Sequence, residues 1–364
     1  MMYPLKFKPV YKDYLWGGRR LESYGKDLPE GITAESWELS CHPNGQSIVK
    51  EGKFEGQALA DLIQQYPAEL LGSAVQGKDL EKFPLLVKLI DANQSLSVQV
   101  HPNDAYANEH ENGEYGKNEM WYIVEAPEGA TLIAGVLRGT DKKALAEAIE
   151  EGRCEELLQH IPVKAGDVIN IPAGLVHAIT EGLIVYEVQQ NSDTTYRMYD
   201  YNRRGADGKL RELHIDKALD VTDFTNAGGR VSFQGLTLQK EAGDPLTRRV
   251  LVVNRYFAVE EYLLNGTSSF NANGETFCIL SNLEGEATIH YGEDKKVTLS
   301  RGETAYIPAT LGEWTLEGNK AKIIASYLPN LRQLWPKLKE AAPKGQLDNL
   351  IGLRPYADGI TASL

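Results

Sequence analysis

The sequence predicts an all-β protein with helical insertions, built from two related β units. Short runs rich in β-branched and aromatic residues, separated by Gly and Pro, dominate the chain, for example at residues 98–101, 119–124 and 131–136. Helical periodicity is clear in only a few stretches, chiefly residues 59–66 and 142–159. We therefore expect an antiparallel sandwich or barrel framework into which the helices are inserted.

A degenerate internal repeat supports the division into two units. The segment that starts at Gly166 and runs to Ile-Pro-Ala at residues 171–173 recurs 136 residues later, from Gly302 to residues 307–309. Upstream, Glu119 matches Glu275 at an offset of 156, so the first copy holds 20 more residues between the two landmarks. The predicted helix inserted in the first copy accounts for this difference.

These landmarks predict three parts. Residues 1–230 form a metal-binding catalytic domain with helical insertions, and residues 231–328 form a second, degenerate domain without metal ligands. The tail over residues 329–364 has a possible amphipathic helix around residues 331–342, and no role follows from its sequence.

Composition and charge exclude several classes of protein. The 364 residues include 38 Lys plus Arg and 51 Asp plus Glu, a net charge of −13, which disfavours nucleic acid and anionic membranes as partners. No apolar run reaches the ~18 residues of a membrane-spanning helix, and the N-terminus lacks the apolar core of a signal peptide. Cys41, Cys154 and Cys278 show no paired spacing. We expect a reduced, cytoplasmic protein.

Four polar residues of the first unit form a candidate metal site. Gln99 and His101 lie two apart in an apolar strand and therefore leave it on the same face. Glu119 begins the next apolar strand, and His177 follows a tight turn, where the second unit has Glu313 instead. Two imidazoles, a carboxylate and an amide suit a Lewis-acid cation that leaves room for water or substrate. The alternative is four unrelated, solvated residues at strand ends.

Several motifs in this region resemble those of type I mannose-6-phosphate isomerases, which are zinc enzymes of the cupin superfamily. The resemblance covers about residues 3–328 and corresponds to the compact bacterial form. The motifs that carry it are Trp-Gly-Gly (16–18), Glu-Ser-Trp-Glu (35–38), Ser-Val-Gln-Val-His-Pro-Asn-Asp (97–104), Lys-Asn-Glu-Met-Trp-Tyr (117–122), Pro-Ala-Gly-Leu-Val-His-Ala (172–178) and Tyr-Glu-Val-Gln-Gln-Asn-Ser-Asp-Thr-Thr-Tyr-Arg (186–197).

The resemblance implies two cupin barrels and one zinc ion per chain, bound by Gln99, His101, Glu119 and His177. It also implies interconversion of mannose 6-phosphate and fructose 6-phosphate, with Arg197 in the active site. Longer family members have His-Lys-Pro-Glu before the carboxylate ligand, whereas this chain has Gly-Lys-Asn-Glu at residues 116–119. The tail over residues 329–364 has no counterpart in the family motifs, and the resemblance does not predict the oligomeric state.

Aldose–ketose isomerisation moves a proton between adjacent carbons, so it needs a base and stabilisation of enediolate oxygens. Arg197 would hold the enediolate or the phosphate, unless it pairs with a neighbouring carboxylate. Lys117 would meet the phosphate or relay a proton, unless it is a solvated turn lysine. Glu187 and Asp193 are both available as the base, or could orient Arg197.

Two further residues are candidates for substrate binding. Lys88 is an isolated charge within an apolar strand, so it faces a wet cavity or is paired. Trp16 would form a pocket wall or belong to the core. Two rival functions stay open: an iron-dependent cupin dioxygenase, and a sugar-phosphate-binding protein without turnover. In either isomerase or binding protein, the partner is a small sugar phosphate.

Overall fold

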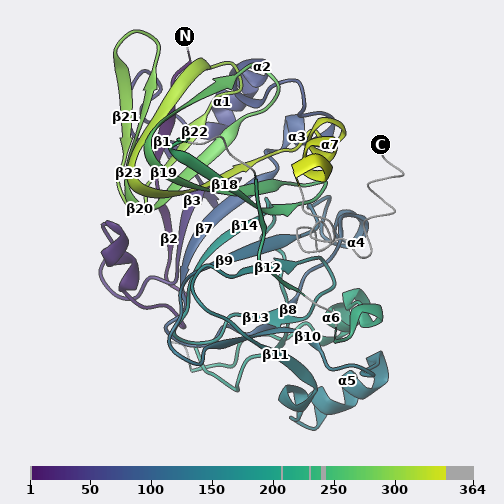
Figure 1. The fold of residues 1–364 in the computed structure, drawn as a ribbon. Coiled ribbons are helices and arrows are strands. Elements are labelled where there is room, and N and C mark those ends of the chain that lie inside the picture. The colour runs from purple at the N-terminus through teal and green to yellow at the C-terminus, as the bar shows by residue number, and fades with distance from the viewer. Residues whose placement is uncertain (1, 206–207, 229–230, 239–242, 342–364) are drawn as a thin grey trace.

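The structure is a computed structural model that describes residues 2–205, 208–228, 231–238 and 243–341. Strands are its main regular secondary structure, in two units that lie one above the other (Figure 1). The helices are short and lie at the periphery of the sheets (Figure 1). The predicted fold class, β-sheet units with helical insertions, is confirmed.

The first unit consists of two antiparallel sheets. The larger sheet has the order β16 (Ser232–Phe233), β12 (Val168–Ile171), β9 (Glu119–Glu125), β14 (Ile184–Gln190), β7 (Leu85–Asp91), β3 (Glu35–Leu39) and β2 (Val10–Lys12). The smaller sheet has the order β11 (Leu158–Pro162), β10 (Thr131–Val136), β13 (His177–Ala178), β8 (Val98–Val100) and β15 (Tyr196–Tyr199). Trp121, Leu132 and Val185 belong to one buried cluster, so side chains of both sheets share a core.

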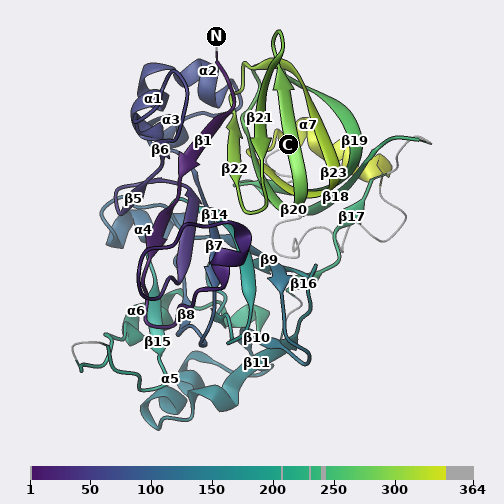
Figure 2. The same cartoon turned by 90° about the vertical axis from the view of Figure 1, so that its left-hand side faces the viewer.

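The second unit is a nine-stranded sheet with three long strands, which curve around its core (Figure 2). Its order is β17 (Leu236–Thr237), β18 (Leu246–Val253), β19 (Ala258–Ala272), β23 (Gly312–Tyr327), β20 (Cys278–Tyr291), β22 (Thr304–Ile307), β1 (Leu5–Lys8) and β6 (Ile48–Val49), with β21 (Lys295–Leu299) on β20. Tyr262, Leu280 and Leu316 pack together in its core. The curvature lets one sheet enclose an apolar interior.

Two strand pairings cross the division expected from the sequence. β1 pairs with β22, with Leu5 opposite Tyr306, although it lies at the N-terminus of the chain. β16 follows the first unit in sequence yet pairs with β12, with Phe233 opposite Val168. Each unit therefore completes a sheet of the other, and side chains from both contribute to one large buried cluster.

The strand registers refine the internal repeat. β12 and β22 span the same positions at the offset of 136. In the first unit Ile171 lies opposite Glu119, whereas in the second unit Ile307 lies opposite Cys278. Cys278, rather than Glu275, therefore takes the place of the carboxylate. The offset of 156 aligned Glu119 with Glu275 instead, because sequence similarity does not fix the strand register.

The helices include the three stretches expected from the sequence and others that the periodicity did not predict. They are α1 (Leu59–Gln65), α2 (Pro67–Leu71), α3 (Lys78–Glu81), α4 (Asp104–His110), α5 (Lys142–Glu150), α6 (Ile215–Val221) and α7 (Leu331–Ala341), with 3₁₀ turns η1 (Arg20–Tyr24), η2 (Cys154–Leu157) and η3 (Phe224–Asn226), and a small hairpin of β4 (Cys41–His42) and β5 (Gly45–Gln46). α5 ends before the expected residue 159 because Gly152 has a φ of 70°, and β11 follows. α7 matches the expected tail helix up to residue 341; residue 342 is outside the described residues.

None of the helices in the described ranges is long and apolar enough to cross a membrane.

Candidate metal centre and active-site cleft

Three strand ends bring the predicted ligands together. Gln99 lies in β8, and its register partners are His177 at the start of β13 on one side and Arg197 in β15 on the other. His101 directly follows β8, and Glu119 is the first residue of β9 in the facing sheet. Side chains that are opposite each other on neighbouring strands project on the same face. The two sheets therefore direct these side chains into the space between them.

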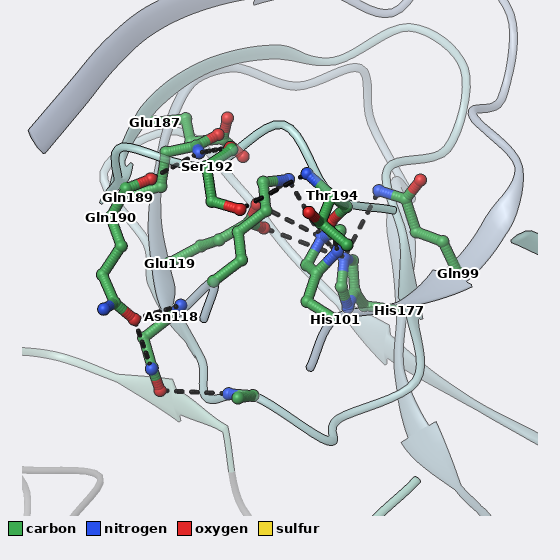
Figure 3. Close-up of polar contacts among 12 residues, drawn as sticks. Gln99, His101, Asn118, Glu119, His177, Glu187, Gln189, Gln190, Ser192 and Thr194 are labelled. Atoms are coloured by element: carbon green, nitrogen blue, oxygen red, sulfur yellow. Dashed lines mark hydrogen bonds and ion pairs between the residues drawn. The ribbon is translucent and has the colours of Figure 1, made fainter. Parts of the chain in front are cut away.

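The ligand atoms lie within bonding reach of one ion (Figure 3). The two Nε2 atoms of His101 and His177 are 3.1 Å apart. Glu119 Oε1 is 3.3 Å from His101 Nε2, and Oε2 is 3.7 Å from His177 Nε2. The amide nitrogen of Gln99 is 3.4 Å from His177 Nε2, and a turn of that amide would present its oxygen instead. All four predicted ligands thus converge.

Backbone carbonyls fix the orientation of both imidazoles. His101 Nδ1 donates to the carbonyl of Thr194 at 3.0 Å (Figure 3), and His177 Nδ1 donates to the carbonyl of Leu175 at 2.8 Å. The proton of each neutral ring is thereby placed on Nδ1, which leaves the Nε2 lone pair facing the centre. This arrangement is typical of histidine ligands of metal ions.

The electrostatics of the cluster favour a bound cation. His101, Glu119 and His177 are almost completely buried, and Oε2 of Glu119 has no hydrogen-bond partner among the described residues. Burial and the charge of Lys117 lower the pKa of His101 to about 3, and burial lowers that of His177. Burial would raise the pKa of Glu119, but Lys117 and His101 hold it well below its usual range. Two neutral imidazoles and an ionised carboxylate with one oxygen free of hydrogen bonds from the described residues fit a divalent ion.

Lys117 is the cation nearest the candidate ligands. Its Nζ lies 2.6 Å from Glu119 Oε1 and 3.1 Å from His101 Nε2, and its side chain is buried. The expectation of a solvated turn lysine is therefore wrong. The ammonium group therefore lies deep beside the candidate ligands and not at the protein surface.

A cleft of about 280 Å³ opens next to the cluster. All the predicted catalytic and substrate-binding residues line it. They are Trp16, Lys88, Lys117, Glu187, Asp193 and Arg197, joined by Gln99 and by residues that the sequence did not single out, among them Tyr14, Glu35, Ser97 and Arg211. Trp16 also belongs to a buried apolar cluster, so it is both a wall and a core residue.

The two candidate bases differ in their surroundings. Burial and the nearby charge of Glu119 raise the pKa of Glu187 to about 7. Glu187 accepts a hydrogen bond from Trp121 Nε1 at 2.8 Å and lies 3.2 Å from Lys88 Nζ. Burial acts to raise the pKa of Asp193 too, but Lys88 and a 2.9 Å hydrogen bond from Asn44 lower it overall. Only Glu187 has a pKa near neutrality, where a base works best.

Lys88 is paired within the cleft wall. Its ammonium lies 3.4 Å from Glu35 and 3.2 Å from Glu187, and all three side chains are buried. Burial acts to lower the pKa of Lys88, but the two carboxylates raise it overall, so it stays charged. Both expectations for this residue, a place at a cavity and a charged partner, are met.

Arg197 belongs to a cluster of guanidinium groups at the rim. It donates to Ser97 Oγ at 3.3 Å and to the carbonyl of Glu212 at 2.8 Å, and not to Glu187 or Asp193. Burial and the charge of Arg211 lower its pKa. Arg211 is itself held by Asp200 through two hydrogen bonds of 2.7 Å. The sequence did not reveal Arg211 because it lies in a loop without periodicity or motif.

A buried His/Glu/His cluster beside a cleft in a two-unit β protein defines this chain as a cupin-type protein with a candidate metal centre. The chain matches the family models "Phosphomannose isomerase type I, catalytic domain" over residues 4–150 and "Mannose-6-phosphate isomerase, cupin domain" over residues 247–328. It is 42% identical to the mannose-6-phosphate isomerase ManA of Bacillus subtilis, over 89% of this chain and 99% of that protein. The chain belongs to the type I mannose-6-phosphate isomerase family, and it is an enzyme of that family.

Other comparisons agree. The mannose-6-phosphate isomerase of Streptococcus mutans is 38% identical over 90% of this chain and 99% of its own length. The crystal structure of the Bacillus subtilis mannose 6-phosphate isomerase superposes with a TM-score of 0.81 at 36% identity, covering 89% of this chain and 99% of that one. A variant of phosphomannose isomerase from Salmonella typhimurium has the same fold, with a TM-score of 0.70 at 18% identity, covering 90% of this chain and 100% of that one. The family predicted from the motifs is confirmed.

Proposed function

We propose that this chain interconverts mannose 6-phosphate and fructose 6-phosphate through a cis-enediol, with one zinc ion per chain held by Gln99, His101, Glu119 and His177. The observation that carries the proposal is the buried His/Glu/His cluster beside a cleft lined by lysine and arginine. When bound, the zinc ion would supply Lewis-acid polarisation of the substrate oxygens without redox chemistry. The nitrogen- and oxygen-rich ligand set supports zinc as the metal.

The other residues of the cleft carry out proton transfer and balance charge. Glu187, with its pKa near 7, takes the proton from C2 of mannose 6-phosphate and returns it to C1. Lys117, beside the ligands, moves the proton between the two oxygens. Lys88 holds Glu187 in place through their ion pair. Asp193 stays ionised, and its negative charge partly balances the positive charge of Lys88.

The arginines provide fixed positive charge for an anionic substrate. Arg197 lies next to Gln99 across the β8–β15 pair, which places its side chain on the ligand face, where it stabilises the enediolate. Arg211, further along the rim, binds the phosphate with the guanidinium nitrogen that Asp200 leaves free. Trp16 forms an apolar wall that limits access of water. All these residues fall within 1–230, which supports this part as the catalytic domain.

A coupled assay tests the proposal. Purified protein is stripped with a chelator, reloaded with zinc or iron at one equivalent, and assayed for fructose 6-phosphate formation from mannose 6-phosphate. We expect turnover with zinc and little without metal. Binding of sugar phosphate without turnover would indicate a non-catalytic binding protein. Oxygen consumption with iron would indicate a dioxygenase. Either result would overturn the proposal.

A further inference from the structure

A tyrosine of the second unit contacts the segment that follows the first histidine ligand. Tyr256 donates a 2.7 Å hydrogen bond to Asp104 Oδ2. Asn254 fixes the loop that carries Tyr256, because its side-chain oxygen accepts the backbone N–H groups of Tyr256 at 2.8 Å and Phe257 at 2.9 Å. Phe257 is fully buried, which anchors the same loop in the core. Tyr256 is therefore presented to Asp104 by a rigid turn.

Asp104 also forms hydrogen bonds with two other segments near the candidate metal centre. Its second oxygen, Oδ1, accepts the backbone N–H of Gly116 at 2.9 Å and the amide Nε2 of Gln190 at 3.0 Å. A side chain at Gly116 would clash with the backbone here, since a Cβ would lie 2.5 Å from the Asp104 nitrogen. Asp104 thus joins the segment after His101 to the segment before Glu119 at van der Waals distance.

Gln190 and Asn118 complete the chain of hydrogen bonds. Gln190 Oε1 accepts both the backbone N–H of Asn118 at 3.0 Å and its side-chain amide at 2.7 Å (Figure 3). Asn118 Oδ1 in turn accepts the N–H of Ala173, in the turn that leads to His177, at 3.0 Å. Both amide side chains are buried. Asn118 directly precedes Glu119, so this network reaches all three segments that carry His101, Glu119 and His177.

We propose that Tyr256 is a positioning residue for the metal ligands, acting from the second unit through Asp104, Gln190 and Asn118. The inference rests on the proposed function, because it assumes that the cluster binds metal. It gives the second unit, whose described residues hold no His/Cys/Asp/Glu cluster of this kind, a part in the metal site. Hydrogen-bonded partners one step beyond the ligands commonly change metal affinity by ~10–100-fold when they are removed.

Arg255 also lies near Asp104, but it carries less of the effect. Its distance to Asp104 is 3.4 Å and its side chain is 64% exposed. An exposed ion pair of this kind contributes little because water and salt screen it. Tyr256 is packed against the core and points its hydroxyl at the carboxylate, so its hydrogen bond is the one that fixes Asp104.

The test compares Tyr256→Phe with a matched control, Tyr122→Phe. Tyr122 also donates a 2.7 Å hydrogen bond from one unit to a carboxylate of the other, Glu261. It lies in β9 with Glu119, but three residues on and on the opposite face of the strand, and its hydrogen bond is not part of the Asp104 network. Three quantities are measured for each variant: the zinc dissociation constant by chelator competition, the absorption spectrum of the cobalt-loaded protein, and the melting temperature of the metal-free protein. Gln190→Met serves as a second variant closer to the ligands.

We expect Tyr256→Phe to raise the zinc dissociation constant about tenfold and to shift the cobalt spectrum, and Gln190→Met to do the same more strongly. Tyr122→Phe should leave both unchanged, even where the two Tyr→Phe variants lower the metal-free melting temperature alike. Wild-type zinc affinity and cobalt spectrum in Tyr256→Phe would overturn the inference. Failure of the wild-type chain to bind zinc or to isomerise would instead overturn the proposed function.

Discussion

Replacement of Arg197 by alanine separates the two roles that its charge could play. If Arg197 stabilises the enediolate, the charge that it meets develops only on the way to the transition state, so kcat falls and KM stays nearly constant. If it holds the phosphate, which is charged throughout, KM rises and kcat changes little. Its place opposite Gln99 in the strand ladder favours the first outcome.

The size of the effect follows from the surroundings of Arg197. Loss of one preorganised donor to a developing oxyanion costs about 2.7–4 kcal/mol in buried sites. Arg197 is only partly buried, and Arg211 still contributes positive charge in the variant, so we expect a loss near or below the lower end of this range. A loss of about 2–3 kcal/mol corresponds to a roughly 30- to 150-fold decrease in kcat.

Steady-state kinetics of Arg197→Ala, with zinc content measured in parallel, distinguish the enediolate role from the phosphate role. The matched control is Arg203→Ala. Arg203 also pairs with Asp200, but it is not among the residues that line the cleft. We expect its kcat to stay within about threefold of wild type. A strong rise in KM with unchanged kcat for Arg197→Ala would refute the enediolate role, and unchanged values of both constants at full zinc would refute any catalytic role.

Three further predictions follow from the same site. His101→Ala and His177→Ala should each abolish zinc binding and isomerase activity, whereas Glu313→Ala, at the matching position of the second unit, should leave both intact; zinc analysis and the coupled assay check this. The acidic limb of the kcat/KM profile should have its midpoint between 4.5 and about 7, since Glu187 must lose its proton to act and a bound cation lowers its pKa; Glu187→Gln should remove the remaining activity at every pH. Lys88→Met should lower the free energy of unfolding by about 3–5 kcal/mol, because buried carboxylates lose their counter-charge. The pKa of Glu187 is already above its unfolded value, and loss of Lys88 raises it further, so the loss seen in urea titrations should be larger at pH 8 than at pH 6.

Much of the fold and site was predictable because it depends on local patterns. Alternating apolar residues define strands, and two residues two apart on a strand share a face, which was enough to place Gln99 and His101 together. Motifs in the right order identified the family, and they predicted four ligands whose side chains lie together in the structure. Helical periodicity located α1, α7 and the start of α5. It did not predict α2, α3 or α6, and it missed the end of α5, where a glycine in a left-handed conformation stops the helix.

Other features were decided only by tertiary structure, because strand pairing and burial join residues far apart in the chain. The sequence shows that residues 5–8 can form a strand, but not that β1 would complete the sheet of the second unit. It left the choice between Glu187 and Asp193 open, since their pKa values differ through burial and through neighbours on other strands. In the same way, a loop with no motif of its own brings Arg211 to the cleft, and a turn of the second unit brings Tyr256 to Asp104. Charge and hydrogen bonding act through space over a few ångströms, so the sequence determined the kinds of groups present and the tertiary structure determined their partners.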